Sequence, residues 1–436
     1  MIKVSGAAVA ASSAFSMPYV ISRSAAQAEP LTFWQFYSEG AVGTQAQWFE
    51  TMVEAWNAEN ETQVRLEFIP PPSEDYYTKL STAFAAGEGP DIFLLSPSDF
   101  LRYANNDALQ DLTPFLEEEA RTDFYEGVMT TRIVDGKILA LPMEVEPIAL
   151  YYSVQAFQEV GLTEADIPQT WDQLLEVGER LTTGDRYGLL FETRPGGYQV
   201  FMWYPWMWMG GGDVTTPDGL QSNFNHPGTV QGLRFWQETI EREIAPREAL
   251  GPGSGDVIAN LVAGYCAIQN TGIWSIAALR ENAPDFEYGV FKLPVPPDGT
   301  YTTDAGGWAF AANARGQNPE AAAQFIIWAI GSMQDDSVQR VVDWCTEAKS
   351  DMPPRQSVLE RATEAGAYAE GTLRTFAEEI LPGARGEPRT PPEVWQLITD
   401  AIQSCQLGGA DPAQQAEETS QQIEEYLATY EGARIL

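Results

Sequence analysis

Residues 135–153 read Asp-Gly-Lys-Ile-Leu-Ala-Leu-Pro-Met-Glu-Val-Glu-Pro-Ile-Ala-Leu-Tyr-Tyr-Ser, and the expected fold is organised around this stretch. Two carboxylates, Glu144 and Glu146, stand two positions apart in an apolar run. In an extended chain such residues share one face, so both carboxylates point the same way. Buried carboxylates need donors, which the hydroxyls of a polar ligand can supply. We therefore predict that this stretch forms a wall of a binding site; the alternative is an edge strand with two solvated glutamates.

Length and charge limit the classes of protein to consider. The chain has 436 residues, more than a single core usually spans, so two domains are expected. A hydrophobic fraction of 44% excludes wholesale disorder. Asp and Glu number 62 against 25 Lys and Arg, and the net charge of -37 repels phosphate backbones and anionic lipid. Nucleic acid and membrane surfaces are therefore not expected partners, and the acidity reflects either a solvated surface or a high-salt habitat.

The inventory of reactive side chains argues against most enzyme classes. The cysteines, Cys266, Cys345 and Cys405, form no Cys-x-x-Cys motif, and His226 is the only histidine. Zinc sites and catalysis by Ser-His-Asp or Cys-His arrangements are nearly excluded. No Walker loop, Gly-x-Gly-x-x-Gly or EF-hand loop occurs, so no metal or cofactor is expected. Cys345 and Cys405 could pair in an exported protein, although spacing alone cannot fix the connectivity.

Residues 1–28 have the features of an export signal. A run of small and apolar residues follows Lys3, and Ser-Ala-Ala-Gln-Ala before Glu29 has the form of a signal-peptidase site. The run is too short and too weakly apolar for a stable membrane anchor. It resembles the end of a twin-arginine signal without the two arginines, so either the start is truncated or the export route differs. No cysteine stands at the cleavage site, and we expect a soluble periplasmic protein.

From residue 31 the hydrophobic pattern alternates between strand and helix. The first elements are expected at 31–37, 48–56, 63–69, 76–84 and 91–96. This alternation is typical of βαβ units with a mainly parallel sheet, whose ligands bind beyond the carboxyl ends of the strands. The loops at 37–40 and 96–99 are therefore candidates for a binding site.

Two aromatic segments follow in the second half of the chain. Residues 198–208 carry six aromatic side chains, of which a helix can direct only one stripe toward a cleft, so most are expected in the core. Trp274 follows Gly272 at the start of a predicted helix, where glycine allows close approach of the backbone. Aromatic faces suit sugar rings, and we predict that Trp274 forms the floor of a pocket; the alternative is a core tryptophan.

Local signals place further elements. Thr170 and Gln173 have capping-box spacing before a helix, Asn318 precedes a proline at a helix start, and His226 is a candidate cap. A β-hairpin is expected at 213–224, with Asp-Gly at its turn.

Several of these segments resemble one family. Residues 135–162, DGKILALPMEVEPIALYYSVQAFQEVGL, resemble the crossover segment of extracellular solute-binding proteins of carbohydrate ABC importers, which include the maltodextrin-binding proteins. Asn-Thr-Gly-Ile-Trp at 270–274 resembles a family signature whose tryptophan stacks on the sugar. Gly306-Gly307-Trp308 and the run 352–360, MPPRQSVLE, are similar to further interlobe segments.

The resemblance implies a two-lobe α/β fold in which each lobe is a mainly parallel sheet flanked by helices and three crossings join the lobes. Lobe 1 would comprise 29–143 and 305–348, and lobe 2 would comprise 144–304 and 349–436. The implied protein is a monomer and not an enzyme. It binds a mono- to oligosaccharide in the cleft, closes by a hinge motion and delivers the ligand to a membrane permease.

The resemblance also implies ligand contacts from both lobes. For Asp99 the alternative is a helix N-cap, for Arg355 a structural salt bridge, and for Trp395 a core position. The candidate ligand-binding residues are Glu39, Asp99, Glu144, Glu146, Glu192, Tyr198, Trp274, Gly306, Gly307, Trp308, Arg355 and Trp395.

Three alternative functions remain at this point. A secreted glycoside hydrolase would use carboxylate pairs and aromatics in the same way, but no acid and nucleophile pair stands in a recognisable motif. The same fold could cage a polyamine through charge pairing and cation–π contact. A glycerol phosphate ligand is less favoured, because Arg355 is the one cation among the candidates.

Overall fold

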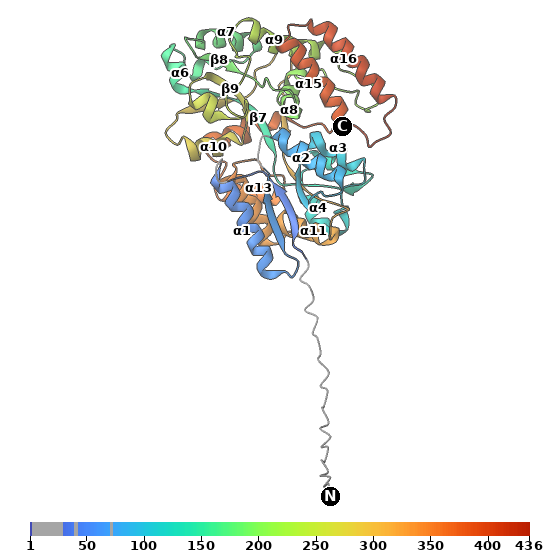
Figure 1. The fold of residues 1–436 in the computed structure, drawn as a ribbon. Helices are drawn as coiled ribbons and strands as arrows, with labels where there is room; N and C mark the ends of the chain where they lie inside the picture. The colour runs from blue at the N-terminus through green and yellow to red at the C-terminus, as the bar shows by residue number, and fades with distance from the viewer. Residues whose placement is uncertain (2–28, 39–41, 70–72) are drawn as a thin grey trace.

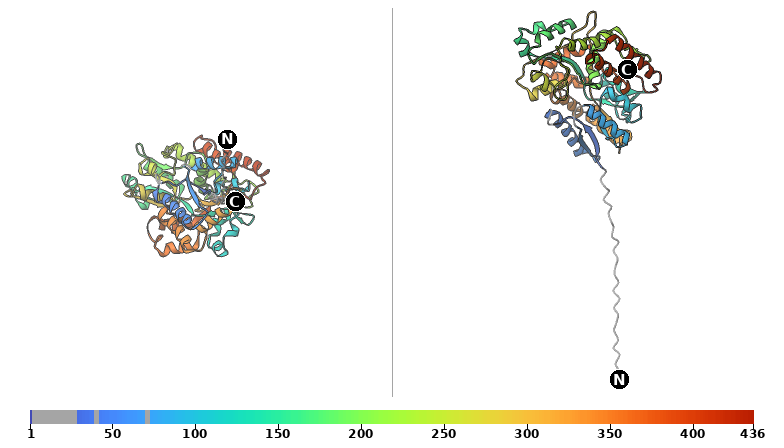
Figure 2. Two further views of the ribbon diagram at one scale, coloured as in Figure 1. Left: turned by 60° about the horizontal axis from the view of Figure 1, so that its bottom comes forward. Right: turned by 45° about the horizontal axis from the view of Figure 1, so that its top comes forward.

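The computed structural model describes residue 1 and residues 29–38, 42–69 and 73–436, and these form two lobes joined at a hinge (Figure 1). The expected export signal at 2–28 and the candidate Glu39 lie outside the described residues. The helices that follow the first strands lie in one lobe, and the C-terminal helices α15 (Pro392–Gln406) and α16 (Pro412–Leu427) lie in the other (Figures 1 and 2).

The first lobe is built on a five-stranded sheet. Strand β1 pairs with β2 and β3 in parallel, whereas β12 runs antiparallel to β3 and β6. In sheet order the strands are β2 (Val64–Phe68), β1 (Leu31–Gln35), β3 (Ile92–Leu95), β12 (Ala309–Ala312) and β6 (Leu141–Pro142). Its principal helices are α1 (Gly43–Glu59), α2 (Ser73–Ala86), α3 (Pro97–Ala104), α11 (Pro319–Ile326) and α12 (Asp335–Asp343).

The second lobe is built around β7 (Glu146–Ser153), whose eight residues are all buried. Strand β7 runs antiparallel to β9, β10 and β11, and only the β8–β9 and β11–β13 pairs are parallel. The other strands are β8 (Tyr187–Leu190), β9 (Cys266–Gly272), β10 (Tyr288–Phe291), β11 (Thr303–Gly306) and β13 (Ala384–Gly386). The remaining long helices are α7 (Trp171–Leu181), α8 (Gly197–Trp208), α9 (Pro227–Glu241) and α10 (Ser275–Asn282).

Short elements complete the chain. Strands β4 and β5 form a separate two-stranded sheet. These elements are β4 (Ile133–Val134), β5 (Lys137–Ile138), α4 (Glu118–Asp123), α5 (Glu126–Met129), α6 (Val154–Glu159), α13 (Gln356–Glu364) and α14 (Gly371–Thr375).

Three segments of the chain meet at the hinge. The first runs from β6 into β7, and the second runs from β11 of one sheet into β12 of the other. The third contains a π-helical turn, Trp344–Ala348, and then Met352, which forms an isolated bridge with Val145. Helix α13 still packs against α12, whereas α14 packs against β10, so the third segment completes its passage after α13. The residue boundaries of the lobes stay a prediction.

The expected two-lobe α/β fold is confirmed, but both sheets are mixed rather than mainly parallel. The reason is geometric, because a strand that continues directly from the other lobe enters the sheet against the direction of its neighbours. The expected hairpin at 213–224 is reduced to one bridge, Thr215 to Ser222, around a turn in which Gly219 has a φ of 73°.

Side-chain caps confirm three local predictions. Thr170 and Gln173 form the reciprocal capping box at the start of α7. Asn318 accepts a hydrogen bond from the Ala321 N–H at the start of α11. His226 Nδ1 accepts from the Gly228 N–H at 3.0 Å, so the histidine caps α9.

All three cysteines are free and buried, so the suggested bridge between Cys345 and Cys405 is wrong. Cys345 lies in the turn after α12 and Cys405 lies in α15, which places the two thiols in different lobes. Among the described residues, no helix combines the length and the apolar character needed to cross a membrane.

The capping box offers a test of local stability. Thr170→Ala removes the hydroxyl that accepts the Gln173 N–H, and we expect the free energy of unfolding to fall by about 1 kcal/mol. Urea denaturation followed by circular dichroism measures this change. Thr51→Ala, at an exposed position inside α1, serves as the control, since alanine is a good helix former. An equal loss in both variants would contradict the capping interpretation.

Candidate ligand-binding site

A cavity of about 270 Å³ lies between the lobes, beside the hinge. Loops after β1 and β3 and the second crossing line it from the first lobe, while the start of β7 and the starts of α8 and α10 line it from the second. The lining residues are Phe36, Tyr37, Val42, Gln45, Tyr77, Ser96, Ser98, Glu146, Gly197, Tyr198, Phe201, Trp274, Ala278, Gly307, Trp308, Lys349 and Glu387.

One wall of the cavity is an aromatic cluster of the first lobe. The Trp308 ring stacks on Tyr77 with centroids 5.8 Å apart, and the ring of Phe36 has its centroid 4.6 Å from that of Trp308. The Tyr77 hydroxyl donates to Ser96 Oγ at 2.7 Å, which fixes the ring from its polar end. This wall therefore presents a fixed aromatic surface to a ligand.

A second aromatic wall faces the cavity from the other lobe. The rings of Tyr198 and Phe201, from the first two turns of α8, lie 6.3 and 6.2 Å from the ring of Trp274. A Cβ on Gly272 would come within 1.8 Å of the Trp274 ring, so glycine is required where this ring crosses the backbone. The structure places Trp274 and Tyr198 in the cavity lining, with Trp274 in a wall rather than the floor, and their contact with a ligand stays a prediction.

The floor of the cavity is a buried ionic cluster around Lys349. Its ammonium donates to Glu144 Oε1 at 2.7 Å and to Glu146 Oε1, and Asp351 Oδ2 lies 3.3 Å away. The ring of Tyr37 lies 5.3 Å from the same ammonium. The three carboxylates are close enough together to hold a metal ion, but Lys349 already binds each of them.

Glu144 and Gly307 hold the interlobe crossings together beneath the cavity. Glu144 is fully buried and accepts hydrogen bonds from Trp344 Nε1 and from the Trp308 N–H at 3.1 Å, so it does not line the cavity. Gly307 has a φ of 130°, and a Cβ there would come within 2.5 Å of the Glu144 carbonyl oxygen. Only glycine fits this position, which lets Trp308 reach the cavity.

Glu387 is a second carboxylate in the cavity lining, and sequence reasoning missed it along with Lys349. It follows β13 and is 5% exposed. A Cβ on Gly306 would approach Glu387 Oε2 to 2.8 Å, and Gly306 pairs with Glu146 across β11 and β7. The two acidic side chains therefore flank the same backbone position, although 241 residues separate them in the sequence, as their numbers show.

Burial governs the protonation of these groups. Desolvation raises the pKa of Glu146 from 4.5 to about 7, against the opposing attraction of Lys349. Desolvation likewise raises the pKa of Glu387 from 4.5 to about 8, and the charge on Arg132 and hydrogen bonds from Ser98 oppose the rise. Burial also raises the pKa of Asp351 well above its ordinary value. A ligand that stabilises charged carboxylates would therefore be favoured at this floor.

A polar pocket of about 300 Å³ adjoins the cavity and shares Tyr77, Ser98 and Gly197 with it. It contains two predicted contacts, Asp99 and Trp395, which come from different lobes. Asp99 does not cap its helix, because Ser96 holds the N-cap position of α3. Its Oδ1 instead accepts from Arg102 Nε at 2.6 Å, while burial raises its pKa from 3.8 to about 6.

Two other candidates lie outside the cavity lining. Glu192 is buried and holds a turn, since it accepts hydrogen bonds from the N–H groups of Thr193 and Arg194 and from both N–H and hydroxyl of Ser254. Gly306 lines a separate cavity of about 270 Å³ behind β11, together with Val145. Neither position touches the main cavity directly.

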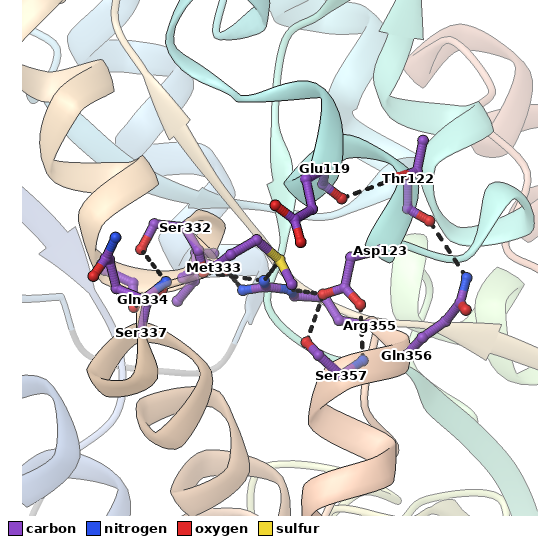
Figure 3. A network of polar contacts seen from close by, with 12 residues as sticks. Glu119, Thr122, Asp123, Ser332, Met333, Gln334, Ser337, Arg355, Gln356 and Ser357 are labelled. Atoms are coloured by element: carbon purple, nitrogen blue, oxygen red, sulfur yellow. Dashed lines mark hydrogen bonds and ion pairs between the residues drawn. The ribbon is translucent and has the colours of Figure 1, made fainter.

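Arg355 occupies a buried polar network (Figure 3). Its Nε donates to Asp123 Oδ2 at 2.7 Å, and its other nitrogens donate to the carbonyl oxygens of Ile330 at 2.9 Å and Ser332 at 3.0 Å. Ser357 donates to the same Asp123 carboxylate from the start of α13. Arg355 thus joins α4, α13 and the π-helical turn that follows α11 (Ile327–Gly331), and it lies outside the cavity lining.

Two α/β lobes that meet at three crossings, with a cavity between them, are the architecture of a two-lobe binding protein. The family model of the bacterial extracellular solute-binding proteins matches residues 40–335. The chain therefore belongs to this family, as the sequence resemblance indicated.

Similar proteins span most of the chain. A putative binding protein of Brucella abortus is 23% identical over 372 residues, which cover 84% of this chain and 86% of the relative. An arabinooligosaccharide-binding protein of Bacillus subtilis is 25% identical and covers 69% of each chain. An ABC transporter solute-binding protein of Thermotoga lettingae, solved with α-D-tagatose, is 20% identical, with a TM-score of 0.78 over 92% of this chain and 100% of that chain. The structural likeness shows a shared fold.

The network around Arg355 predicts a loss of stability. Asp123→Asn would leave the buried guanidinium without its counter-charge, and we expect the free energy of unfolding to fall by about 3 to 5 kcal/mol. Asp335→Asn breaks a largely exposed ion pair with Arg361 and should cost about 0 to 1 kcal/mol. Denaturant titration measures both variants. Equal small losses would mean that the Asp123 pair does not anchor these helices.

The acidic groups at the cavity predict a pH dependence. The folded pKa of Glu387 is raised, so the folded state binds more protons than the unfolded state between about pH 4.5 and about pH 8. The stabilising contribution is complete below the lower value and is lost as the pH rises through the higher one. We expect the melting temperature of the ligand-free protein to fall over this range, and the fall to be smaller in Glu387→Gln. Glu248→Gln, at an exposed site, should retain the wild-type slope, whereas identical slopes in all three proteins would contradict this origin.

Proposed function

We propose that this protein binds a saccharide in the interlobe cavity and delivers it to the membrane permease of an ABC importer. The observation that carries the proposal is the pair of aromatic walls, Tyr77 and Trp308 opposite Tyr198 and Trp274, on either side of Glu146. Aromatic faces stack on the apolar faces of sugar rings, and carboxylates accept hydrogen bonds from hydroxyl groups. Family membership and the ligands named for the relatives support the same ligand class.

The proposed contacts divide into two groups. Glu146, Tyr198, Gly307, Trp308 and Trp274 line the main cavity and are proposed to contact the first ring. Asp99 and Trp395 line the adjoining pocket and are proposed to contact a second ring, so the site accommodates a disaccharide or longer ligand. In this proposal Glu144, Glu192, Gly306 and Arg355 support the site through the contacts described above.

The carboxylate pair that stands out in the sequence is not arranged for glycoside hydrolysis. Hydrolysis needs a pair of carboxyl groups free to act as acid and as nucleophile or base on either side of the bond. Glu144 and Glu146 instead share the ammonium of Lys349. We therefore propose that this protein has a binding role. In this proposal the protein is exported and docks on the outer side of its permease in the cytoplasmic membrane.

A ligand screen tests the proposal. Residues 29–436 would be examined by thermal shift with mono-, di- and oligosaccharides, and a ligand that binds only the folded state should stabilise it by about 3 kcal/mol at a hundredfold excess over Kd. Trp274→Ala and Glu146→Gln should reduce the shift, because each removes one type of proposed contact. Trp328→Phe, at a helix far from the cavity lining, is the matched aromatic control. No shift with any saccharide would contradict the proposal.

A further inference from the structure

Negative charge exceeds positive charge around the cavity. Among the described residues, five carboxylates and two cations are buried at the hinge and the adjoining cavity lining. They are Glu144, Glu146, Asp304, Asp351 and Glu387, with Lys349 and Arg132. The ammonium of Lys349 is shared by three of these carboxylates, so it cannot neutralise them all. The floor therefore carries unbalanced negative charge in a poorly solvated place, which is costly unless a cation or protons offset it.

Glu146 keeps one oxygen for the cavity. Its Oε1 accepts from Lys349, and within the described part of the chain no donor reaches Oε2. The side chain is 7% exposed and lines the cavity, so a group bound in the cavity can reach this oxygen. A group that enters the cavity is the remaining source of a hydrogen bond.

Glu387 accepts hydrogen bonds from Ser98, but within the described part of the chain no cation forms a salt bridge with it. The guanidinium of Arg132 attracts it but donates its hydrogen bonds to the Gly307 carbonyl oxygen at 2.7 Å and to Thr131 Oγ1. Behind it lies Asp304, which is fully buried and whose two carboxylate oxygens have no hydrogen-bond partner among the described residues. Glu387 and Glu146 flank Gly306, so both can reach one ligand group.

Apart from Lys349, the described residues that complete the lining carry no positive charge. Ser96 and Ser98 hydrogen-bond to each other, with oxygens 3.0 Å apart, and Lys349 is held by its carboxylates. The other large side chains are aromatic, and aromatic faces attract cations. A neutral ring would find donors for its oxygens in the Gln45 amide and the indole N–H groups of Trp274 and Trp308, but it would bring no counter-charge to the carboxylates. An ammonium would supply that charge and would also be attracted by the aromatic faces.

We propose that the saccharide recognised by this cleft is an amino sugar, and that its ammonium group lies between Glu146 and Glu387. An ammonium has three donors and no acceptor, so it can bind Glu146 Oε2 and Glu387 through charge-assisted hydrogen bonds while the aromatic walls cover the ring. This inference rests on the proposed saccharide function and narrows its substrate class. It makes Glu387 a specificity-determining residue.

Matched pairs of sugars test the inference on the wild-type protein. Glucosamine, galactosamine and mannosamine would each be compared by calorimetry with the neutral parent sugar and its N-acetyl derivative, below the pKa of the sugar amine. Chitosan and chitin dimers and trimers extend the comparison to the adjoining pocket. We expect at least one amine to bind about tenfold more tightly than both neutral partners, as charge-assisted hydrogen bonds allow.

Two variants assign the preference to the proposed residues. Glu387→Gln and Glu146→Gln remove a charge and keep the shape, and each should bring the ratio of amine to neutral affinity toward one. Glu248→Gln, at an exposed position, should keep the ratio. Circular dichroism confirms folding, and if one cavity variant fails to fold, the other still decides the assignment.

The outcomes separate this inference from the proposed function. Equal binding of amine and neutral sugars would overturn the ammonium site and leave the saccharide function intact. Binding of choline or putrescine without any sugar would support the cation site but overturn the saccharide function. Failure of all probes would contradict both. An amine preference that survives both cavity variants would overturn the assignment to Glu146 and Glu387.

Discussion

The salt-bridged cluster around Lys349 is the constraint on which the hinge and the site both depend. Glu144 and Glu146 belong to the first crossing, Lys349 and Asp351 belong to the third, and the Trp308 N–H of the second donates to Glu144. All three crossings are thus tied together at one buried point. Burying these charges yields little net stability, but it determines the relative position of three segments that are far apart in the sequence.

The same cluster explains why the cavity stands where it does. Glu146 is the first residue of β7, and Gly307 and Trp308 are the two residues between β11 and β12, so the chain lines the cleft at the points where it passes between the lobes. Gly307 brings Trp308 against Tyr77, and Gly272, the last residue of β9, lets the Trp274 ring lie over the backbone of that strand. Close approach of backbone to side chain at these two glycines creates the two aromatic walls.

The sequence predicts those site residues whose positions depend on their immediate neighbours in the chain. Trp274 and Trp308 each follow a glycine, and this signal is visible in the sequence. Gly272 leaves room for the Trp274 ring, whereas Gly307 leaves room for the backbone of Glu144. Lys349 lies in the polar run Lys-Ser-Asp and reads as a surface residue, because its burial depends on carboxylates about 200 residues earlier. Glu387 follows a three-residue strand, β13, whose pairing partner β11 is distant in the sequence. Arg355 forms a salt bridge with Asp123, which is also distant in the sequence. The alternation of strands and helices in the sequence predicts the α/β fold class. It does not predict that both sheets are mixed, because the antiparallel strands are those that continue directly from the other lobe.

The two lobes contribute different side chains to the cavity, and this difference bears on the kinetics of ligand binding. The carboxylates Glu146 and Glu387 and the Trp274 wall belong to the second lobe, whereas the first lobe contributes the Trp308 wall and hydroxyl groups. A ligand can therefore be captured by one half of the molecule before the other half covers it. In this order of binding, substitutions in the second lobe change both the association and the dissociation rate of the ligand. Substitutions in the Trp308 wall change mainly the dissociation rate, and with it the residence time.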